Sequence, residues 1–260
     1  MMTSTTTAKR CMAGLLPMAL LGLTAAFSQA ASTTEGSPET THAQTVSETL
    51  SARQQSLVPI AAFAAAGEIS RLSAALNQGL DAGLTVSEAR EVLVQVYAYA
   101  GFPRSLNALG ELMKVLEARK QRGIEDAPGR APSRPIPVGE ALRVAGAANQ
   151  TKLVGEPVQG PLFDFAPAID EYLKTHLFGD IFERDNLDWE SLELATVGML
   201  SALPGAEAQL QSHMRISMNV GLTVGQLHQL IQVLAERVGT DNATRARIAL
   251  KQTLATSPKR

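Results

Sequence analysis

Two side chains in the last third of the sequence have the types and spacing needed to move a proton. Glu193 is the only charged residue in the apolar stretch 192–203. His213 shares a helical face with apolar residues, Leu210 and Met214 among them, which places it on the buried side of a helix. A carboxylate beside a histidine favours the charged ring, fixes its tautomer and holds a proton donor in a water-poor cleft. If the two helices pack as antiparallel neighbours, the pair predicts acid–base chemistry.

The same residues also fit a structural interpretation. A histidine on an apolar face is commonly a hydrogen-bonded core residue, and a glutamate in the first helical turn commonly interacts with the helix dipole. Three further histidines carry less weight: His176 and His228 are interpreted as surface or packing residues, and His42 lies in a polar N-terminal stretch.

The candidate pair belongs to the second copy of a repeated pattern. A shift of 138 positions brings Gly67 onto Gly205 and Gly101 onto Gly239 without a gap. Almost every segment after residue 48 has helical spacing, and no alternating apolar and polar run is long enough to suggest a sheet. The sequence therefore predicts an all-α protein made by tandem duplication of one helical unit.

A four-residue string, GLTV, occurs in both copies and predicts a tight turn between two helices. In the second copy, Gly221 fits the left-handed position that ends a helix, and Thr223 fits the N-cap of the next. Gln226 completes a capping box. The first copy has the same arrangement, with Gly83 ending a helix, Thr85 as the N-cap of the next and Glu88 in the place of Gln226. Each unit is thus predicted to contain a helical hairpin.

The N-terminus reads as a targeting segment rather than as part of the fold. Residues 1–30 begin with Lys9 and Arg10, continue with a short apolar run and end with small residues, as a secretory signal peptide does. Residues 31–47 are polar and are expected to form a flexible tether. We therefore expect a periplasmic or secreted protein with no stable membrane insertion after cleavage.

Two folded units follow. The first is expected over 48–121 and the second over 162–256. Residues 122–161 are rich in proline and glycine, so we expect a long connection over the surface.

Composition excludes several kinds of chemistry. The only cysteine, Cys11, precedes the apolar run of the signal segment, so a lipid anchor has no support and the mature chain would contain no cysteine. A disulfide framework, a thiol nucleophile, a Cys-x-x-Cys pair and a cysteine metal site are thereby excluded. The formal net charge is −2 without a basic stripe, so nucleic acid is not an expected partner.

Several motifs of the second unit, and one of the first, resemble a known family. They are His176 to Gly179, Leu187-Asp188 with Glu193-Leu194, the turn at Gly205, Leu210 with His213 and Arg215, Asn219 to Thr223, and the YAGFP segment at 99–103. Together they resemble the carboxymuconolactone decarboxylase family, whose fold is alkylhydroperoxidase D-like. The resemblance extends over nearly all of residues 50–254.

The resemblance implies a reaction and an assembly. In the family reaction, loss of carbon dioxide from a lactone acid leaves a delocalised carbanion that must be protonated. The resemblance implies that His213 is the acid, Glu193 its orienter and Arg215 a substrate-binding anchor for the carboxylate, although its spacing from His213 favours an outward position. No metal or organic cofactor is required. By the same resemblance we expect a homo-oligomer, a trimer of two-unit chains, acting on a small molecule.

Peroxidase-type relatives give a contrast. Their Cys-x-x-Cys positions fall near Ala206 and Gln209 here, so a thiol-dependent hydroperoxide reductase is disfavoured.

The repeat supplies an internal comparison for the site. Glu193, His213 and Arg215 fall on Gln55, Ala75 and Asn77 of the first unit, so one site per chain is expected. The leading hypothesis is a cofactor-independent decarboxylase-like enzyme acting on a small carboxylated or lactone-type substrate. A non-enzymatic binding or scaffold protein is the alternative, and cysteine-independent peroxide handling is the least favoured.

Overall fold

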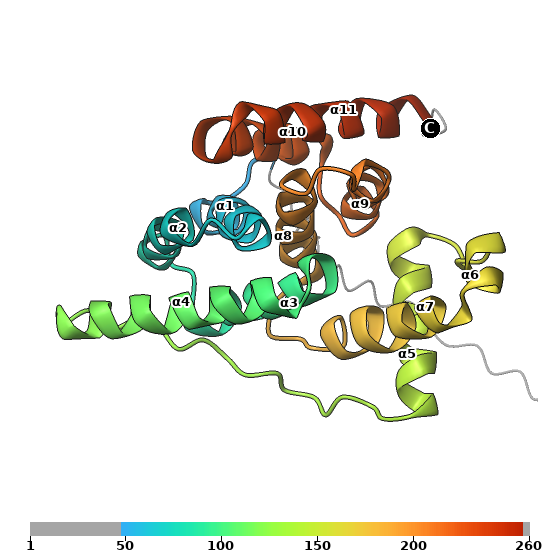
Figure 1. Ribbon diagram of the computed structural model, residues 1–260, viewed down its shortest axis with the longest axis horizontal. Coiled ribbons are helices and arrows are strands. Elements are labelled where there is room, and N and C mark those ends of the chain that lie inside the picture. The colour runs from blue at the N-terminus through green and yellow to red at the C-terminus, as the bar shows by residue number, and fades with distance from the viewer. Residues whose placement is uncertain (1–47, 257–260) are drawn as a thin grey trace, which may run out of the picture. The chain divides into compact units, whose positions relative to one another are not determined.

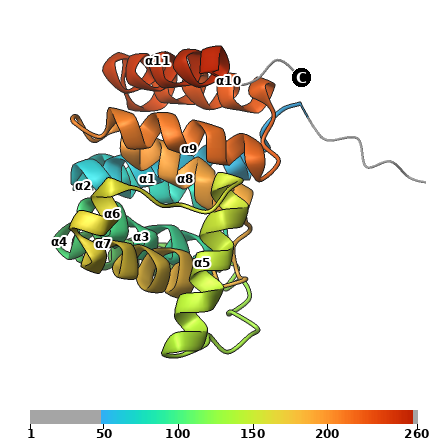
Figure 2. The same cartoon turned by 90° about the vertical axis from the view of Figure 1, so that its right-hand side faces the viewer.

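The computed structural model describes residues 48–256, and every regular element in this range is a helix (Figures 1 and 2). The expected all-α fold is confirmed. The signal peptide expected over 1–30 and the tether expected over 31–47 lie outside the described residues. Within the described range, no helix combines the length and apolar character needed to cross a membrane.

Four helices form the first unit: α1 Ala52–Ala66, α2 Ile69–Asp81, α3 Val86–Ala100 and α4 Phe102–Gln121. Ser51 caps α1 and Thr85 caps α3, each through a complete capping box. The chain turns between α2 and α3 at Gly83, whose φ of 90° is a backbone conformation that favours glycine.

The second unit repeats this plan. Its helices are α8 Trp189–Ser201, α9 Glu207–Asn219, α10 Val224–Val233 with its π-helical continuation η2 Leu234–Val238, and α11 Thr240–Thr256. A shift of 138 positions carries the ends of α2 onto those of α9, and the ends of α3 onto the start of α10 and the end of η2. Thr223 forms the predicted capping box with Gln226. The helix boundaries therefore confirm the duplication.

A third group of helices lies between the two units along the chain and to one side of them in space: α5 Glu140–Val154, α6 Pro161–Phe165, α7 Pro167–Tyr172 and the π-helical η1 Leu173–Ile181 (Figure 2). No helix was expected over residues 122–161, yet α5 lies within this range. Its contact with η1 depends on Gly146, because a Cβ atom there would lie 1.7 Å from the carbonyl oxygen of Lys174.

The segment between α4 and α5 is fixed to the first unit by backbone hydrogen bonds. The amides of Val86 and Ser87, at the start of α3, donate to the carbonyl oxygens of Ala127 (2.9 Å) and Pro128 (3.0 Å). These bonds satisfy two of the amides that a helix leaves unpaired at its N-terminus. The connection is thus held on α3 rather than free.

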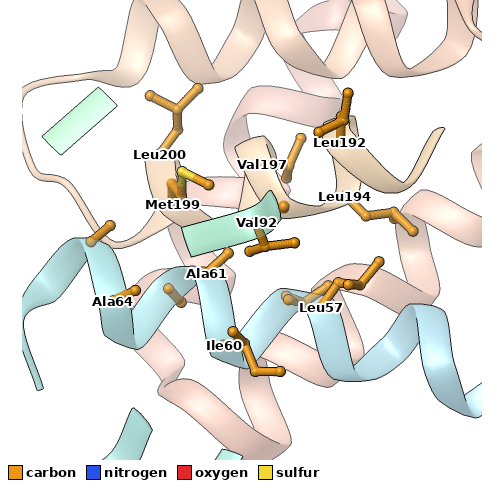
Figure 3. Close-up of a cluster of buried hydrophobic side chains, with 14 of the residues drawn as sticks. Leu57, Ile60, Ala61, Ala64, Val92, Leu192, Leu194, Val197, Met199 and Leu200 are labelled. Atoms are coloured by element: carbon orange, nitrogen blue, oxygen red, sulfur yellow. The ribbon is translucent and has the colours of Figure 1, made fainter. Parts of the chain in front are cut away.

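The two units share one core, with α1 and α8 side by side at its centre (Figures 1 and 3). The buried side chains around this contact include Leu57 and Ala61 of α1, and Leu194, Val197 and Met199 of α8 (Figure 3). The helices approach closely at Gly198, where a Cβ atom would lie 2.7 Å from the carbonyl oxygen of Val58. Burial of α8 on all sides explains why its sequence is apolar almost throughout.

Candidate functional site

Helix α8 places a carboxylate inside the protein. Asp188 caps the helix by accepting a hydrogen bond from the amide of Ser191 (2.7 Å), which fixes where the first turn begins. Glu193 is the fifth residue of the helix, just beyond its first turn, so the interpretation that places it in the first turn is wrong; the side chain is 0% exposed. A carboxylate so deeply buried must find a partner, because the cost of removing an unpaired charge from water is high.

The partner is His213 of the neighbouring helix α9. Its Nδ1 atom lies 2.8 Å from Oε2 of Glu193, and 9% of the histidine side chain is exposed. The structure thus brings together the two residues that the sequence singled out. With Glu193 as a carboxylate, which can only accept, the Nδ1–H group donates and Nε2 is left to exchange a proton. Nε2 makes no hydrogen bond within residues 48–256.

Helix α3 of the first unit adds two residues that the sequence analysis missed. The ring of Tyr99 packs edge-on against His213, with 5.6 Å between centroids and 77° between planes. Gln95 lies one turn earlier, is 0% exposed, and donates from Nε2 to Oγ1 of Thr196 on α8 (2.9 Å). Tyr99 belongs to the YAGFP segment, so its place in a family motif was the available signal.

Burial governs the chemistry of this tyrosine. Burial raises the pKa of Tyr99 well above its ordinary value, and the negative charge of Glu193 raises the pKa further. The nearby side chains of Thr196 and Gln95 lower the pKa of Tyr99, but by less than burial and Glu193 raise it. The Tyr99 hydroxyl does not form a hydrogen bond of good geometry with either side chain. Tyr99 therefore stays protonated and can donate a hydrogen bond.

Arg215, the expected substrate anchor, lies elsewhere. It is exposed on α9, and its Nη2 donates to Oγ1 of Thr256 in α11 (3.1 Å). Two residues along a helix turn a side chain through more than half a revolution, which is why Arg215 points away from His213. His176 and His228 are also exposed, and His176 contacts Asp180 (3.2 Å). His42 lies outside the described residues.

Surface clefts of about 330 to 660 Å³ lie away from the pair. The largest of these four clefts is bounded by α5, α6 and α7, and Gln150, Asp170 and Lys174 line it. None of the four contains Glu193 or His213. Across residues 48–256, no three His, Cys, Asp or Glu side chains are grouped so as to hold a metal ion. The site is therefore a buried acid–base pair, with His213 slightly exposed and Tyr99 partly exposed beside it.

Comparison with known proteins agrees with the repeated architecture. The model of the carboxymuconolactone decarboxylase family matches the chain twice, over residues 37–113 and 167–252. The second match contains Glu193 and His213, and the first contains Gln95 and Tyr99. No curated protein matches the chain in sequence. The two matches cover more than half of the chain, which therefore belongs to the carboxymuconolactone decarboxylase family.

Proposed function

We propose that the protein is a cofactor-independent carboxy-lyase that acts on a small carboxylated or lactone-type substrate. His213 donates the proton, and Glu193 orients the imidazole ring. The observation that carries the proposal is the 2.8 Å contact between His213 Nδ1 and Glu193 Oε2 in a setting almost closed to water. Membership of the family supports the choice of reaction class.

The proposed reaction balances without a redox partner. The bond between the carboxylate and its neighbouring carbon breaks, carbon dioxide leaves, and the electron pair stays on that carbon, conjugated with a carbonyl group. His213 transfers a proton from Nε2 to the carbon, and water restores the proton to the ring. A positioned general acid accelerates such a step by about 10²- to 10⁴-fold. Glu193 keeps Nδ1 occupied, so Nε2 is the atom that delivers the proton.

Homo-oligomer formation, with a trimer favoured, belongs to the same proposal. Three large apolar side chains lie exposed along one side of α4: Phe102 (64%), Leu106 (63%) and Met113 (72%). Their spacing of four and seven residues keeps them on a continuous helical face. A contiguous exposed apolar face supports burial against another subunit. Export to a periplasm or out of the cell remains proposed from the N-terminal sequence.

A binding or scaffold role is the competing proposal, and one observation favours it. None of the four surface clefts reaches the pair, so a site held shut in every state would be structural. The two proposals differ in whether His213 transfers a proton to a bound molecule.

The deciding experiment measures decarboxylation of a panel of muconolactone-like and β-keto acids. Wild type is compared with His213→Ala, His213→Gln and Glu193→Gln, where the two glutamines retain a hydrogen-bonding group in the core. His228→Ala, an exposed histidine on α10, and Glu190→Gln, on the same helix as Glu193, are the matched controls. We expect turnover in wild type and both controls, and a loss of at least about 100-fold in folded His213 variants.

Two results would contradict the proposal. Full activity in His213→Gln would show that the ring does not supply the proton. Absence of turnover in wild type across the panel, together with a lower melting temperature in His213→Ala, would favour the binding or scaffold role.

A further inference from the structure

Three buried polar atoms near the acid–base pair have no hydrogen-bond partner among the described residues: Oε1 of Glu193, Oε1 of Gln95 and the hydroxyl of Tyr99. Buried polar atoms in native proteins nearly always have a hydrogen-bond partner, because a buried atom without one loses the hydrogen bonds that it made to water. The three come from two helices, α3 and α8, that belong to different units. The absence of hydrogen-bond partners for all three atoms indicates that an additional polar group binds between them.

The three atoms belong to one neighbourhood. The Tyr99 hydroxyl lies beside the side chains of Gln95 and Thr196, and it lies within the electrostatic reach of Glu193. The Tyr99 ring contacts His213, and His213 is bonded to Glu193. These three unpartnered atoms therefore lie around the same acid–base pair, whereas the other buried unpartnered side-chain atoms of the described residues belong to Asp170, Asn186, Ser191 and Ser217.

Burial indicates the direction from which a ligand enters. Gln95, Glu193 and Thr196 are 0% exposed and form the floor of the cluster. Tyr99 is partly exposed although its hydroxyl is buried, and His213 is 7% exposed, so the rings of these two residues form the outer edge of the cluster. A ligand that reaches the floor must pass their rings.

We infer that Tyr99 is a further catalytic residue of this site, and that its hydroxyl binds the carbonyl oxygen of a small keto or lactone acid. The inference rests on the proposed function and adds to the site a residue of the first unit of the chain. Tyr99 is the donor of the three unpartnered groups, whereas Oε1 of Gln95 and Oε1 of Glu193 are acceptors. These acceptors suit a hydroxyl group of the ligand or a water molecule beside it.

The chemistry of carbon dioxide loss gives the hydroxyl a defined task. When the carboxylate departs, negative charge moves onto the conjugated carbonyl oxygen of the substrate. A fixed hydrogen-bond donor at that oxygen stabilises the transition state more than the ground state, because the charge is larger there. Because its proton is strongly held, Tyr99 donates without ionising itself. His213 then protonates carbon, so the two residues act on different atoms.

The inference explains why the second unit alone would be incomplete. Under the shift of 138 positions, Gln95 and Tyr99 correspond to Val233 and Arg237. Arg237 donates to Gln78 at the protein surface (2.8 Å), and Val233 is a buried apolar residue. Neither therefore supplies, near Gln55 and Ala75, the hydroxyl that Tyr99 supplies near Glu193 and His213. One chain can therefore assemble one such site, from α3 of the first unit and α8 and α9 of the second.

The test compares Tyr99→Phe with Tyr97→Phe in the full-length protein. Tyr97 lies on the same helix, but its ring stacks on Phe102 (4.7 Å), so it is a matched control for loss of a tyrosine hydroxyl. For the best substrate of the panel, we expect kcat to fall by about 10²- to 10³-fold in Tyr99→Phe, the usual effect of removing one oxyanion donor. Tyr97→Phe should match wild type, and both variants should keep the wild-type melting temperature within a few degrees.

A binding measurement separates this inference from the proposed reaction. Binding of 4-oxopentanoate and of pentanoate, which lacks the ketone, is followed by NMR through the ¹³C-labelled ring of His213, assigned with His213→Gln. Wild type and Tyr97→Phe should prefer the keto acid by roughly tenfold, the contribution of about one hydrogen bond, and Tyr99→Phe should lose that preference.

Each outcome has a distinct meaning. Turnover that depends on His213 but not on Tyr99 would overturn the inference and leave the proposed function standing. Absence of turnover with a Tyr99-dependent preference for the ketone would overturn the proposed reaction and keep the binding role of Tyr99. Equal binding of the two acids to wild type would show that the unpartnered atoms hold only water, and would overturn the inference.

Discussion

The two units have the same helices but use corresponding positions differently. In the second unit, Glu193 and His213 bond to each other in the core. In the first, Gln55 donates to the carbonyl oxygen of Leu50 (2.9 Å), and Ala75 is packed at 3% exposure. Asn77, the counterpart of Arg215, accepts hydrogen bonds from Arg119 and Arg122. Equivalent places in one fold therefore serve local structure in one unit and a paired acid and base in the other.

This contrast separates what maintains the fold from what could perform chemistry. Caps, turn glycines and core leucines occur at matching places in both units, while the polar core residues do not. The first unit is not merely a support in this arrangement, because its α3 reaches the site of the second through Gln95 and Tyr99. Four predictions test how far the equivalence of the units extends.

The largest expected effect is on the shared core positions. Leu72 and Leu210 correspond under the repeat and are 0% and 1% exposed. Replacing either by alanine leaves a cavity, so each variant should lose about 3 kcal/mol of unfolding free energy, measured by urea denaturation. A loss confined to one of the two variants would show that the units do not contribute equally to the core.

Two helix glycines should differ in their tolerance of a methyl group. In Gly198→Ala the new Cβ meets a backbone oxygen of α1, whereas in Gly79→Ala it meets the end of the Ile60 side chain at 2.8 Å. We expect a loss of about 2 kcal/mol for the first, because two helices must separate, and a near-neutral second, because the side chain can move and alanine favours the helix. Thermal and urea unfolding of both variants provide the measurement, and equal losses would contradict the account of the α1–α8 contact.

The acid–base pair can be transferred to the first unit. Ala75→His alone should cost about 2 kcal/mol through overpacking, and adding Gln55→Glu should restore about half of that loss by supplying a partner. A double-mutant cycle in urea measures the coupling between the two changes. A coupling indistinguishable from zero would show that the two positions are equivalent along the sequence but not in space.

The smallest effect should be equal in the two units. Thr85 and Thr223 form the same capping box, with Glu88 and Gln226 as their partners. Replacing either threonine by alanine removes one cap and should cost about 1 kcal/mol, visible as a lower midpoint in urea. A much larger cost at Thr85 would indicate that the connection bonded to the start of α3 depends on the cap as well.

The sequence predicted the features that depend on neighbours along the chain. Helix ends followed from Gly83, Gly221 and the capping threonines, and the buried position of His213 followed from helical spacing, whereas its meeting with Glu193 depended on the assumption that the two helices pack as antiparallel neighbours. These are local rules, and repetition of the pattern made them easy to recognise. The outward position of Arg215 also follows from spacing, although its assignment as an anchor came from resemblance.

Other features depend on contacts that one sequence does not reveal. Tyr99 and Gln95 reach the pair because α3 packs on α8, and nothing in their local pattern sets that crossing. Helix α5 was missed because proline and glycine dominate the residues around it, while Gly146 serves a close approach to η1. The expected roles of Glu193, His213 and Arg215, the unit boundaries, export and the trimer stay predictions.

The burial of α8 on all sides limits how the two repeats of this protein can evolve. A gene fragment encoding the second unit alone would expose to water the side of this apolar helix that packs on α1, because α1 belongs to the first unit, while α9 and α11 would still cover other sides. Such a half would be prone to aggregation rather than to independent folding. After the duplication, the polar residues of the two copies could diverge. A recombination event that separated the copies would yield a half prone to aggregation, so selection acts on the two repeats together.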